Sequence, residues 1–529
     1  MNRYDLAIVG YGPTGMVLAA LMGRQGHSVI VFDKYSGLYN LPRAACFDDE
    51  IMRTFQKLGI VDAVSSATVV QTDYDWINGE GETLLEVSYD NPARGGWAAL
   101  YMMYQPHIET VLDQLCKSLP SVEVRQGVAV DGLEVGDEDV LLSGLDKSGA
   151  RIDARARYVV GADGGAGFVR PALGIGFSDY RFQENWLVCD FRKLRPLPAV
   201  PSFRQVCDPV QPVAIVQIGP EHHRFSFMLD PDEAVEQATD HERVWERVSH
   251  WLTPEDAILV RVANYVFRSR VTDRWGTRRV MLAGDAAHEM PPFLAQGMCS
   301  GMRDAHNLAW KLDLVLTDRA DPEILATYQP EREPHVRFIT EKAIELGHVQ
   351  TLRDPAAARE RDQRFLALRE ARREPDKIVY PALSGGLIAT GEPYAGEFFV
   401  QGRVCAEDGR EGLFDDIIGP GPCIVSRRQE LLDGVDEDRL GRWLELGGHV
   451  VLLSDDAADT GADVEPVVAV VADLDGVYRA GFDVHACEVA VVRPDWYLYG
   501  TATDGAGLAS LLARLDHALR CAPRSGTPA

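Results

Sequence analysis

The chain has 529 residues, more than one hydrophobic core usually holds, so two or three domains are expected. Hydrophobic residues make up 46% of it and charged residues 25%, the balance of a soluble globular protein. The formal charge of −27 disfavours a nucleic-acid partner, because an acidic surface repels phosphate groups.

The nine cysteines are scattered and form neither a CxxC pair nor a His/Cys ligand spacing. This pattern favours reduced, mostly buried thiols over a zinc site or a redox dithiol, so we expect no bound metal. The apolar segment 6–22 contains three glycines and a proline, which fits a strand, a turn and a helix and not a membrane span. With no signal peptide in view, we expect a cytoplasmic protein without a membrane partner.

The first predicted elements are a buried strand at 4–9, a Gly-rich turn, a helix that ends at Gly26, and a second buried strand at 28–33. This order is typical of a βαβ unit. Asp33 closes the second strand, where a carboxylate can bind ribose hydroxyls, and Lys34, which follows it, is a further candidate for cofactor binding.

The turn itself reads IVGYGPTG at 8–15. Gly10 allows the tight turn, Gly12 lets the backbone approach a pyrophosphate, and Gly15 permits close packing of helix on strand. The helix start, with Pro13 and Thr14, offers free N–H groups and a positive dipole end to a phosphate. The segment therefore predicts a dinucleotide site, without distinguishing FAD from NAD.

Further along the chain, the run GADGG occupies 161–165, and the hydrophobic pattern then changes. Between about 176 and 274, alternating runs separated by turns predict an antiparallel sheet. A buried strand is expected at 280–283, followed by GDAAH at 284–288 and a long helix from about Gly297.

The charged segment 355–376 is predicted to be a solvated helix or connector. Beyond about 395, short strands end in a hairpin turn at Pro494-Asp495 and a leucine-rich helix. The strand-like runs there are CIVS (423–426), HVVLLS (449–454), PVVAVVA (466–472) and CEVAVV (487–492). This pattern favours a thioredoxin-like unit that lacks the paired cysteines.

Three distant motifs, IVGYGPTG, GADGG and GDAAH, together indicate that one FAD is bound by separate parts of the chain. With LPRAACFDDEIMRTFQ (41–56), PPFLAQGMCSGMRDAHNLAWKL (291–312) and TYQPEREPHV (327–336), the sequence resembles the class A flavoprotein monooxygenases. Within that family it is similar to the 3-(3-hydroxyphenyl)propionate hydroxylases. The resemblance covers about 1–345 in sequence, and the C-terminal unit in architecture alone.

The resemblance implies an α/β fold of the para-hydroxybenzoate hydroxylase type. We expect a Rossmann-like FAD-binding domain with an inserted antiparallel-sheet substrate domain and a C-terminal thioredoxin-like domain. The expected division is 1–175 for the first part of the FAD-binding domain, 176–274 for the substrate domain, 275–394 for its second part with a helical connector, and 395–529 for the C-terminal domain.

The resemblance also implies roles for individual residues. Gly10, Gly12 and Gly15 would hold the pyrophosphate, Asp33 the adenosine ribose, and Arg43 the phosphates. Gln105 would bond the ribityl chain, although a polar residue that only opens a helix remains an alternative. Asp163 of GADGG would lie near the flavin and the nicotinamide.

Residues 284–298 would approach the flavin ring. Asp285, preceded by Gly284, would bond a ribityl hydroxyl, with a helix N-cap as the structural alternative. The N–H groups of Gly297 and Met298 would face flavin N1 and the C2 carbonyl, where the helix dipole favours negative charge. Pro291 and Pro292 resemble prolines that line the reactive face of the flavin, although proline also precedes helices for structural reasons.

The sequence departs from the family at three places. Ala166-Gly167 stands where relatives have Arg-Ser, Cys46 stands at a histidine position, and Ser226 stands where many relatives carry an acid. The first departure affects the expected nicotinamide path. The last is compatible with a different substrate or with a changed surface.

The implied reaction is hydroxylation of a phenolic small molecule with NADH or NADPH and O₂, through a flavin C4a-hydroperoxide. The base that would deprotonate the phenol is not assigned. The pocket candidates are Tyr101, Tyr104, Met228, Pro292 and Phe293, and core packing is the alternative for the tyrosines, Met228 and Phe293. For His288, a structural place at a helix start is favoured over acid–base chemistry.

Two alternatives use the same flavin site: epoxidation or Baeyer–Villiger oxidation of an aromatic polyketide, and, in a different class, a flavin-binding sensor without turnover. A halogenase is disfavoured because its WxWxIP motif is absent. The resemblance also makes a homodimer a mild expectation.

Overall fold

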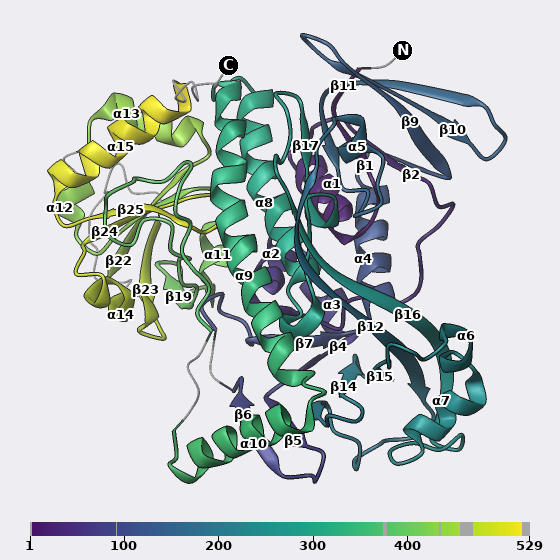
Figure 1. Cartoon of the computed structure of the whole chain (residues 1–529). Helices are drawn as coiled ribbons and strands as arrows, with labels where there is room; N and C mark the ends of the chain where they lie inside the picture. The colour runs from purple at the N-terminus through teal and green to yellow at the C-terminus, as the bar shows by residue number, and fades with distance from the viewer. Residues whose placement is uncertain (1–2, 91–92, 374–377, 433–434, 455–468, 521–529) are drawn as a thin grey trace.

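The computed structural model describes residues 3–90, 93–373, 378–432, 435–454 and 469–520. Figure 1 shows a sheet with its helices next to the N-terminus, a long twisted sheet beneath it, and a third unit at the C-terminal end. Three parts of the predictions lie outside the described residues: the end of the segment predicted at 355–376, the start of the strand predicted at 466–472, and Cys521.

The first sheet carries the nucleotide-binding fold. Its strand order is β8-β2-β1-β11-β10-β9, with β17 beside β11. The parallel strands are β1 (Arg3–Val9), β2 (Val29–Asp33), β8 (Val122–Gln126), β11 (Arg151–Gly161) and β17 (Val280–Leu282). The antiparallel strands are β9 (Val128–Val135) and β10 (Val140–Asp146). Parallel neighbours require crossover connections, and α1 (Pro13–Arg24) joins β1 to β2 while α4 (Gln105–Ser118) leads into β8. The predicted Rossmann-like domain is confirmed.

This sheet brings the three sequence motifs together. Val9 pairs in register with Phe32 on one side and with Gly161 on the other, and Gly161 pairs with Leu282. All four strands run parallel, so their carboxyl ends meet at one edge of the sheet, which is where α/β folds bind ligands. The turn after β1, Asp33, GADGG and GDAAH therefore converge, although the first motif ends at Gly15 and the last begins only at Gly284.

The second sheet has eight strands in the order β18-β16-β12-β15-β14-β13-β5-β6. The strands are β5 (Asp73–Asn78), β6 (Thr83–Ser88), β12 (Phe177–Lys193), β13 (Phe203–Cys207), β14 (Val213–Ile218), β15 (His222–Met228), β16 (Ala257–Thr272) and β18 (His288–Glu289). The central strands are antiparallel, as predicted, but β5 joins β13 in parallel. β5, β6 and β18 thus come from outside 176–274, and the four-part division of the chain remains our proposal.

Several smaller elements complete the first two units. A three-stranded sheet pairs β3 (Cys46–Asp48) and β4 (Thr68–Val70) with β7 (Leu100–Met103). The short helices are α2 (Asp49–Lys57), α3 (Val61–Ser65), α5 (Val169–Ala172), α6 (Val235–Ala238) and α7 (His241–Val248).

Two long helices stand between the nucleotide-binding sheet and the C-terminal unit (Figure 1). They are α8 (Gly297–Leu316), at the predicted position, and α9 (Tyr328–Gln350). α8 is buried along almost its whole length, and α10 (Pro355–Glu370) crosses below the eight-stranded sheet. Within the described chain, no helix has the length and apolar character needed to cross a membrane.

The C-terminal unit is a mixed sheet covered by helices. Its strands, in the order β20-β19-β23-β22-β21-β24-β25, are β19 (Arg403–Ala406), β20 (Glu411–Leu413), β21 (Cys423–Ser426), β22 (His449–Ser454), β23 (Ala469–Asp473), β24 (Val489–Val492) and β25 (Leu498–Ala502). Its helices are α11 (Phe414–Ile418), α12 (Gln429–Leu432), α13 (Glu437–Glu445), α14 (Val477–Val484) and α15 (Gly505–Arg520). The β24–β25 hairpin occupies the predicted turn, and the thioredoxin-like assignment stays a prediction.

Candidate active site

A cavity of about 2050 Å³ lies between the first sheet, the start of α8 and the eight-stranded sheet. Most of the predicted cofactor residues line it: Gly10, Gly12, Pro13, Thr14, Asp33, Lys34, Arg43, Gln105, Asp163, Asp285, Pro292, Gly297 and Met298. Gly15 and Gly284 lie just behind the wall. A Cβ on Gly15 would approach Gly10 O to 2.1 Å, so close packing of α1 on β1 requires glycine there.

Two helices point uncapped N-termini at this cavity. Gly12 is the N-cap of α1, and Gln296 is the N-cap of α8; neither provides a side-chain cap. Free N–H groups and the positive dipole end at a helix start form a ready anion site. The α1 terminus suits a pyrophosphate, and the N–H groups of Gly297 and Met298 suit an electron-rich ring edge.

Arg43 lies across the α1 terminus. A Cβ on Gly12 would be 3.9 Å from its Nη2 atom, so the guanidinium borders the place where a phosphate would sit. The same nitrogen donates to Glu109 Oε1 at 3.0 Å, and the side chain is 45% exposed toward the cavity. Gln105 holds this segment, because its Oε1 accepts from the N–H of Arg43 (2.9 Å) and of Ala44 (2.6 Å). Its predicted contact with the ribityl chain stays a prediction.

Two carboxylates at the strand ends differ in their hydrogen bonding. Asp33 accepts from the N–H of Tyr11 and of Tyr35, both at 2.8 Å, which fixes it beside the turn. Asp163 accepts from Val169 N at 2.9 Å through Oδ2, but its buried Oδ1 has no partner. Burial raises the pKa of Asp163. A buried acceptor without a partner on a cavity wall fits a bound group that donates to it.

Gly167 packs closely against Asp163 in this chain. A Cβ at position 167 would lie 2.2 Å from Asp163 Cγ, so a serine there would displace this carboxylate. Gly164, Gly165, Ala166 and Gly167 all line the cavity, so no side chain larger than a methyl group covers it at these four positions.

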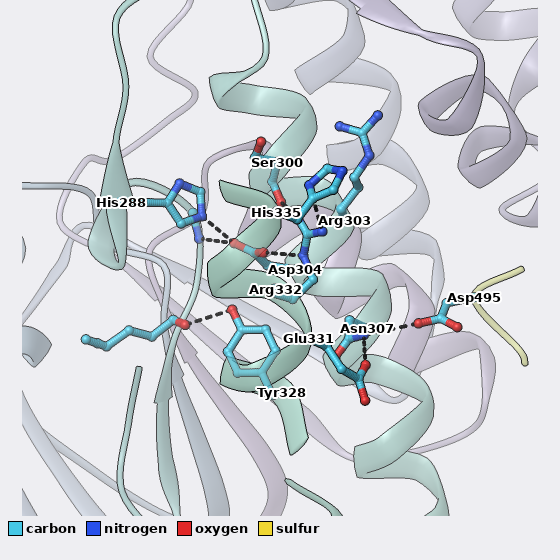
Figure 2. Close-up of polar contacts among 12 residues, drawn as sticks. His288, Ser300, Arg303, Asp304, Asn307, Tyr328, Glu331, Arg332, His335 and Asp495 are labelled. Atoms are coloured by element: carbon cyan, nitrogen blue, oxygen red, sulfur yellow. Dashed lines mark hydrogen bonds and ion pairs between the residues drawn. The ribbon is translucent and has the colours of Figure 1, made fainter. Parts of the chain in front are cut away.

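Asp304 on α8 fixes the GDAAH turn (Figure 2). Its Oδ2 accepts from Gly284 N at 3.0 Å and contacts His288 Nε2 at 2.7 Å, while Oδ1 accepts from Arg332 Nε at 2.9 Å. Burial alone would raise the pKa of Asp304, but His288 and Arg332 outweigh it and lower that pKa. His288 does not line the cavity, which agrees with the structural role favoured from sequence.

Asp285 is the residue that this turn presents. Its side chain is exposed, and it faces the cavity and not a protein neighbour. Because the cavity lies inside the protein, desolvation still raises the pKa of Asp285. Pro292 opens a short 3-10 helix (Pro292–Leu294) on the way to α8, and it lines the cavity together with Phe293. Pro291 is buried behind them.

Beyond these residues, the cavity continues into an aromatic chamber against the eight-stranded sheet. Its aromatic lining consists of Tyr74, Trp76, Trp186, Phe203, Tyr265, Phe267, Phe293 and Phe365. Tyr74 stacks on Phe203 at 3.9 Å, and Trp186 meets Phe293 edge-on at 6.0 Å. Such a chamber accommodates a flat ring, with orientation left to a few polar groups.

Polar groups of the chamber include Gln205, Ser226, Gln350 and the Tyr74 hydroxyl. Gln350 Nε2 donates to Tyr74 Oη at 3.3 Å, which leaves the hydroxyl proton free for another acceptor. Ser226 lies on the wall, so its difference from the family changes the chamber and not the outer surface. Cys46 also lines the cavity.

The structure does not place Tyr101, Tyr104 and Met228 on this wall. The ring of Tyr101 stacks on Phe47 at 5.2 Å, and its hydroxyl accepts from Ala98 N. Tyr104 stacks flat on His222 at 3.9 Å. Tyr74 and Trp76, which do line the chamber, were not predicted from the sequence. Local spacing gives no sign of them, because β5 reaches the chamber by pairing with β13, more than 120 residues later.

Comparisons with known proteins agree with this geometry. The family model of the FAD binding domain matches residues 3–343, and that of the HcaD C-terminal domain matches residues 396–518. The chain is 54% identical to a probable NADH-specific resorcinol 4-hydroxylase of Rhodococcus jostii (strain RHA1), over 98% of this chain and 96% of that protein. It is 34% identical to a 3-(3-hydroxy-phenyl)propionate/3-hydroxycinnamic acid hydroxylase of Mycolicibacterium gilvum (strain PYR-GCK), over 93% of this chain and 88% of that protein.

The chain belongs to the class A flavin hydroxylases. Among solved structures, the flavin-dependent monooxygenase PieE superposes with a TM-score of 0.79 at 20% identity, covering 98% of this chain and 99% of that one. Aklavinone-11 hydroxylase superposes with a TM-score of 0.76 at 22% identity, covering 97% and 99%. These likenesses support the same fold.

This flavin hydroxylase is therefore an FAD-dependent monooxygenase that uses NAD(P)H and O₂ to hydroxylate a phenolic substrate. The hydroxylase relatives do not favour epoxidation, Baeyer–Villiger oxidation or a sensor without turnover. The lining residues fit FAD in three respects: an uncapped helix start for the pyrophosphate, a second one for the ring, and an unpartnered Asp163 oxygen.

Proposed function

We propose that this enzyme hydroxylates resorcinol, or a similarly small uncharged dihydroxybenzene, at carbon 4 with NADH as the reductant. The 54% identity to a probable NADH-specific resorcinol 4-hydroxylase, along almost the whole of both chains, supports this choice. Resorcinol, O₂, NADH and a proton would give 1,2,4-trihydroxybenzene, NAD⁺ and water. One oxygen atom enters the ring, and the other leaves as water.

The observation that carries the substrate choice is that the guanidinium of Arg224 is already hydrogen-bonded to other protein groups. It is the cation that the eight-stranded sheet contributes to the described cavity lining. Its Nε donates to Asp190 at 2.7 Å, one Nη donates to Arg43 O, and the other donates to Pro42 O (2.8 Å) and Asp190 (3.1 Å). Burial would lower the pKa of Arg224, but Asp190 raises it, so the pair stays charged and mutually satisfied.

Among the described residues, the eight-stranded sheet therefore offers a substrate carboxylate in this chamber no cation that is free of protein partners. Burying an unpaired carboxylate costs several kcal/mol, whereas a phenolic hydroxyl needs only hydrogen bonds. Gln205, Gln350 and the Tyr74 hydroxyl offer such bonds among aromatic walls. These features support an uncharged ring over a hydroxyphenylpropionate.

The cofactor and the residues around it would have different roles in the reaction. Bound FAD supplies the redox chemistry, passing electrons from NADH to O₂ and an oxygen atom to the ring. The N–H groups of Gly297 and Met298 would stabilise negative charge at the ring edge. The aromatic chamber would exclude water and hold the ring in orientation, with Tyr74 and Gln350 bonding a substrate hydroxyl.

The test is substrate-stimulated NADH oxidation by the FAD-loaded enzyme with product analysis. We expect resorcinol to stimulate oxidation and to give 1,2,4-trihydroxybenzene with one atom from ¹⁸O₂. NADPH should be a poor reductant, and 3-(3-hydroxyphenyl)propionate should be a poor substrate. Turnover of the phenylpropionate and not of resorcinol would refute the proposal.

Two finer properties belong to the same proposal. We infer that the protein acts in the cytoplasm, in keeping with the unpaired and, except for Cys405, buried cysteines of the described residues, and cell fractionation tests this. We also infer a homodimer, as the resemblance to the family suggests, and light scattering of the full chain would refute it by giving a monomer mass.

A further inference from the structure

We propose that the C-terminal domain is a working part of the flavin site, in which Tyr497 acts through Glu50 and Arg303 to position the uncapped start of α8. Tyr497 comes directly before β25, at the end of the β24–β25 hairpin. It lines the same cavity as Gly297 and Met298, although it is 447 residues away from Glu50 in sequence. The inference rests on FAD binding and not on the choice of resorcinol.

A continuous set of contacts connects Tyr497 to α8. Its Oη donates to Glu50 Oε1 at 3.0 Å, and Arg303 Nε donates to the other oxygen of Glu50 at 2.6 Å. Arg303 Nη1 then donates to Gln296 Oε1 at 2.9 Å. Burial and the nearby Glu50 raise the pKa of Tyr497, so its hydroxyl keeps the proton that it donates.

The end of this chain of contacts controls a helix cap. Gln296 is the N-cap residue of α8, the position from which a side-chain oxygen can accept from the first N–H groups of a helix. Here the amide of Gln296 is held away: its oxygen accepts from Arg303, and its Nε2 donates to Asp48 Oδ2 at 3.1 Å. The N–H groups of Gly297 and Met298 are thereby left for a ligand in the cavity.

Arg303 is fixed from several sides at once. It is 5% exposed, and besides Glu50 and Gln296 it also donates to Asp48. Figure 2 shows Arg303 and its neighbour Asp304 pointing in opposite directions from α8. Arg303 therefore holds the helix cap and Asp304 holds the GDAAH turn, so α8 positions both sides of the flavin site.

The hairpin is itself anchored to α8 and α9. Arg493 Nη2 donates to Glu331 Oε2 at 2.6 Å. Asn307 Nδ2 donates to Glu331 at 2.6 Å and to Asp495 at 3.2 Å (Figure 2). Lys311 lies 2.8 Å from Glu331. The Arg493–Glu331 ion pair joins the hairpin to α9, and the Asn307–Asp495 hydrogen bond joins it to α8, so the segment that carries Tyr497 is held against both helices.

The decisive variant is Tyr497→Phe, which removes only the hydroxyl. The matched control is Tyr499→Phe, since Tyr499 is also buried, lies two residues further along the hairpin, and does not line the cavity. We expect Tyr497→Phe to weaken FAD binding to the apoprotein by about tenfold, the lower end of what one hydrogen bond to a charged group contributes. The control should bind FAD as the unmodified enzyme does.

A second readout separates positioning from general stability. The midpoint potential of the bound flavin should fall in Tyr497→Phe, because the α8 N–H groups would stabilise the reduced, negatively charged ring less well. The fraction of NADH oxidised that yields hydroxylated product should fall as well. Tyr499→Phe should leave both unchanged.

The route through Glu50 is tested by a double-mutant cycle with Glu50→Gln. If Tyr497 acts through Glu50, adding Tyr497→Phe to Glu50→Gln should change the FAD dissociation constant by much less than it does alone. Additive effects would overturn the proposed route. Equal FAD affinity and potential in Tyr497→Phe and Tyr499→Phe would overturn the inference as a whole, whichever phenol is the substrate.

Discussion

Replacing Asp304 with asparagine removes the charge that holds the GDAAH turn. The carboxylate is 0% exposed and has three partners, Gly284 N, His288 Nε2 and Arg332 Nε, at 2.7 to 3.0 Å. Asparagine keeps the shape but leaves the Arg332 guanidinium buried without its counter-ion. Removing one member of a buried ion pair costs about 3–5 kcal/mol, a large part of a typical stability of about 5–15 kcal/mol.

Urea unfolding of the apoprotein and FAD titration measure the consequence. We expect a clearly lower unfolding midpoint and weaker FAD binding, because the freed Gly284 N–H no longer fixes the turn that presents Asp285. The control is Glu345→Gln on α9, whose partner is Lys342 and whose side chain is 62% exposed. An exposed i,i+3 pair of this kind contributes about 0.2–0.5 kcal/mol. If both variants unfold at the same urea concentration and bind FAD equally, Asp304 does not hold the turn.

Three further predictions concern stability and FAD binding. Gly284→Ala should weaken FAD binding more than Gly149→Ala: both glycines have positive φ (+60° and +82°), but only at 284 would a Cβ meet Thr14 Oγ1, at 2.7 Å. Equal FAD dissociation constants would contradict this. Burial would raise the pKa of Glu331, but its buried cationic partners lower it to about 2. Its contribution to stability should therefore be full above about pH 4.3 and be lost as the pH falls toward 2, and thermal midpoints of Glu331→Gln should lack that part of the pH dependence. Burial and the adjacent acid raise the pKa of Asp49 to about 7. Asp49→Asn should therefore raise the thermal midpoint, by an amount that grows from about pH 4 to about pH 7; a constant difference would refute the assignment.

The sequence alone determined the nucleotide-binding half of the site. The turn at Gly10 and Gly12, the acid at Asp33 and the helix start at Gly297 are requirements of backbone conformation and of helix ends, which a few neighbouring residues satisfy. Because parallel strands present their carboxyl ends at one edge, the convergence of these motifs also followed from the order of the elements.

The tertiary structure alone decided which side chains form the chamber and which hold the flavin-facing turns. Tyr74 and Trp76 reach the chamber through a strand pairing that no local pattern indicates, whereas Tyr101 and Tyr104, which stand beside a cofactor motif, are used in packing. The partners of Asp304 and Tyr497 lie on other elements, as far as 447 residues away. Local sequence sets backbone geometry, but the environment of a side chain depends on segments that meet only when the chain has folded.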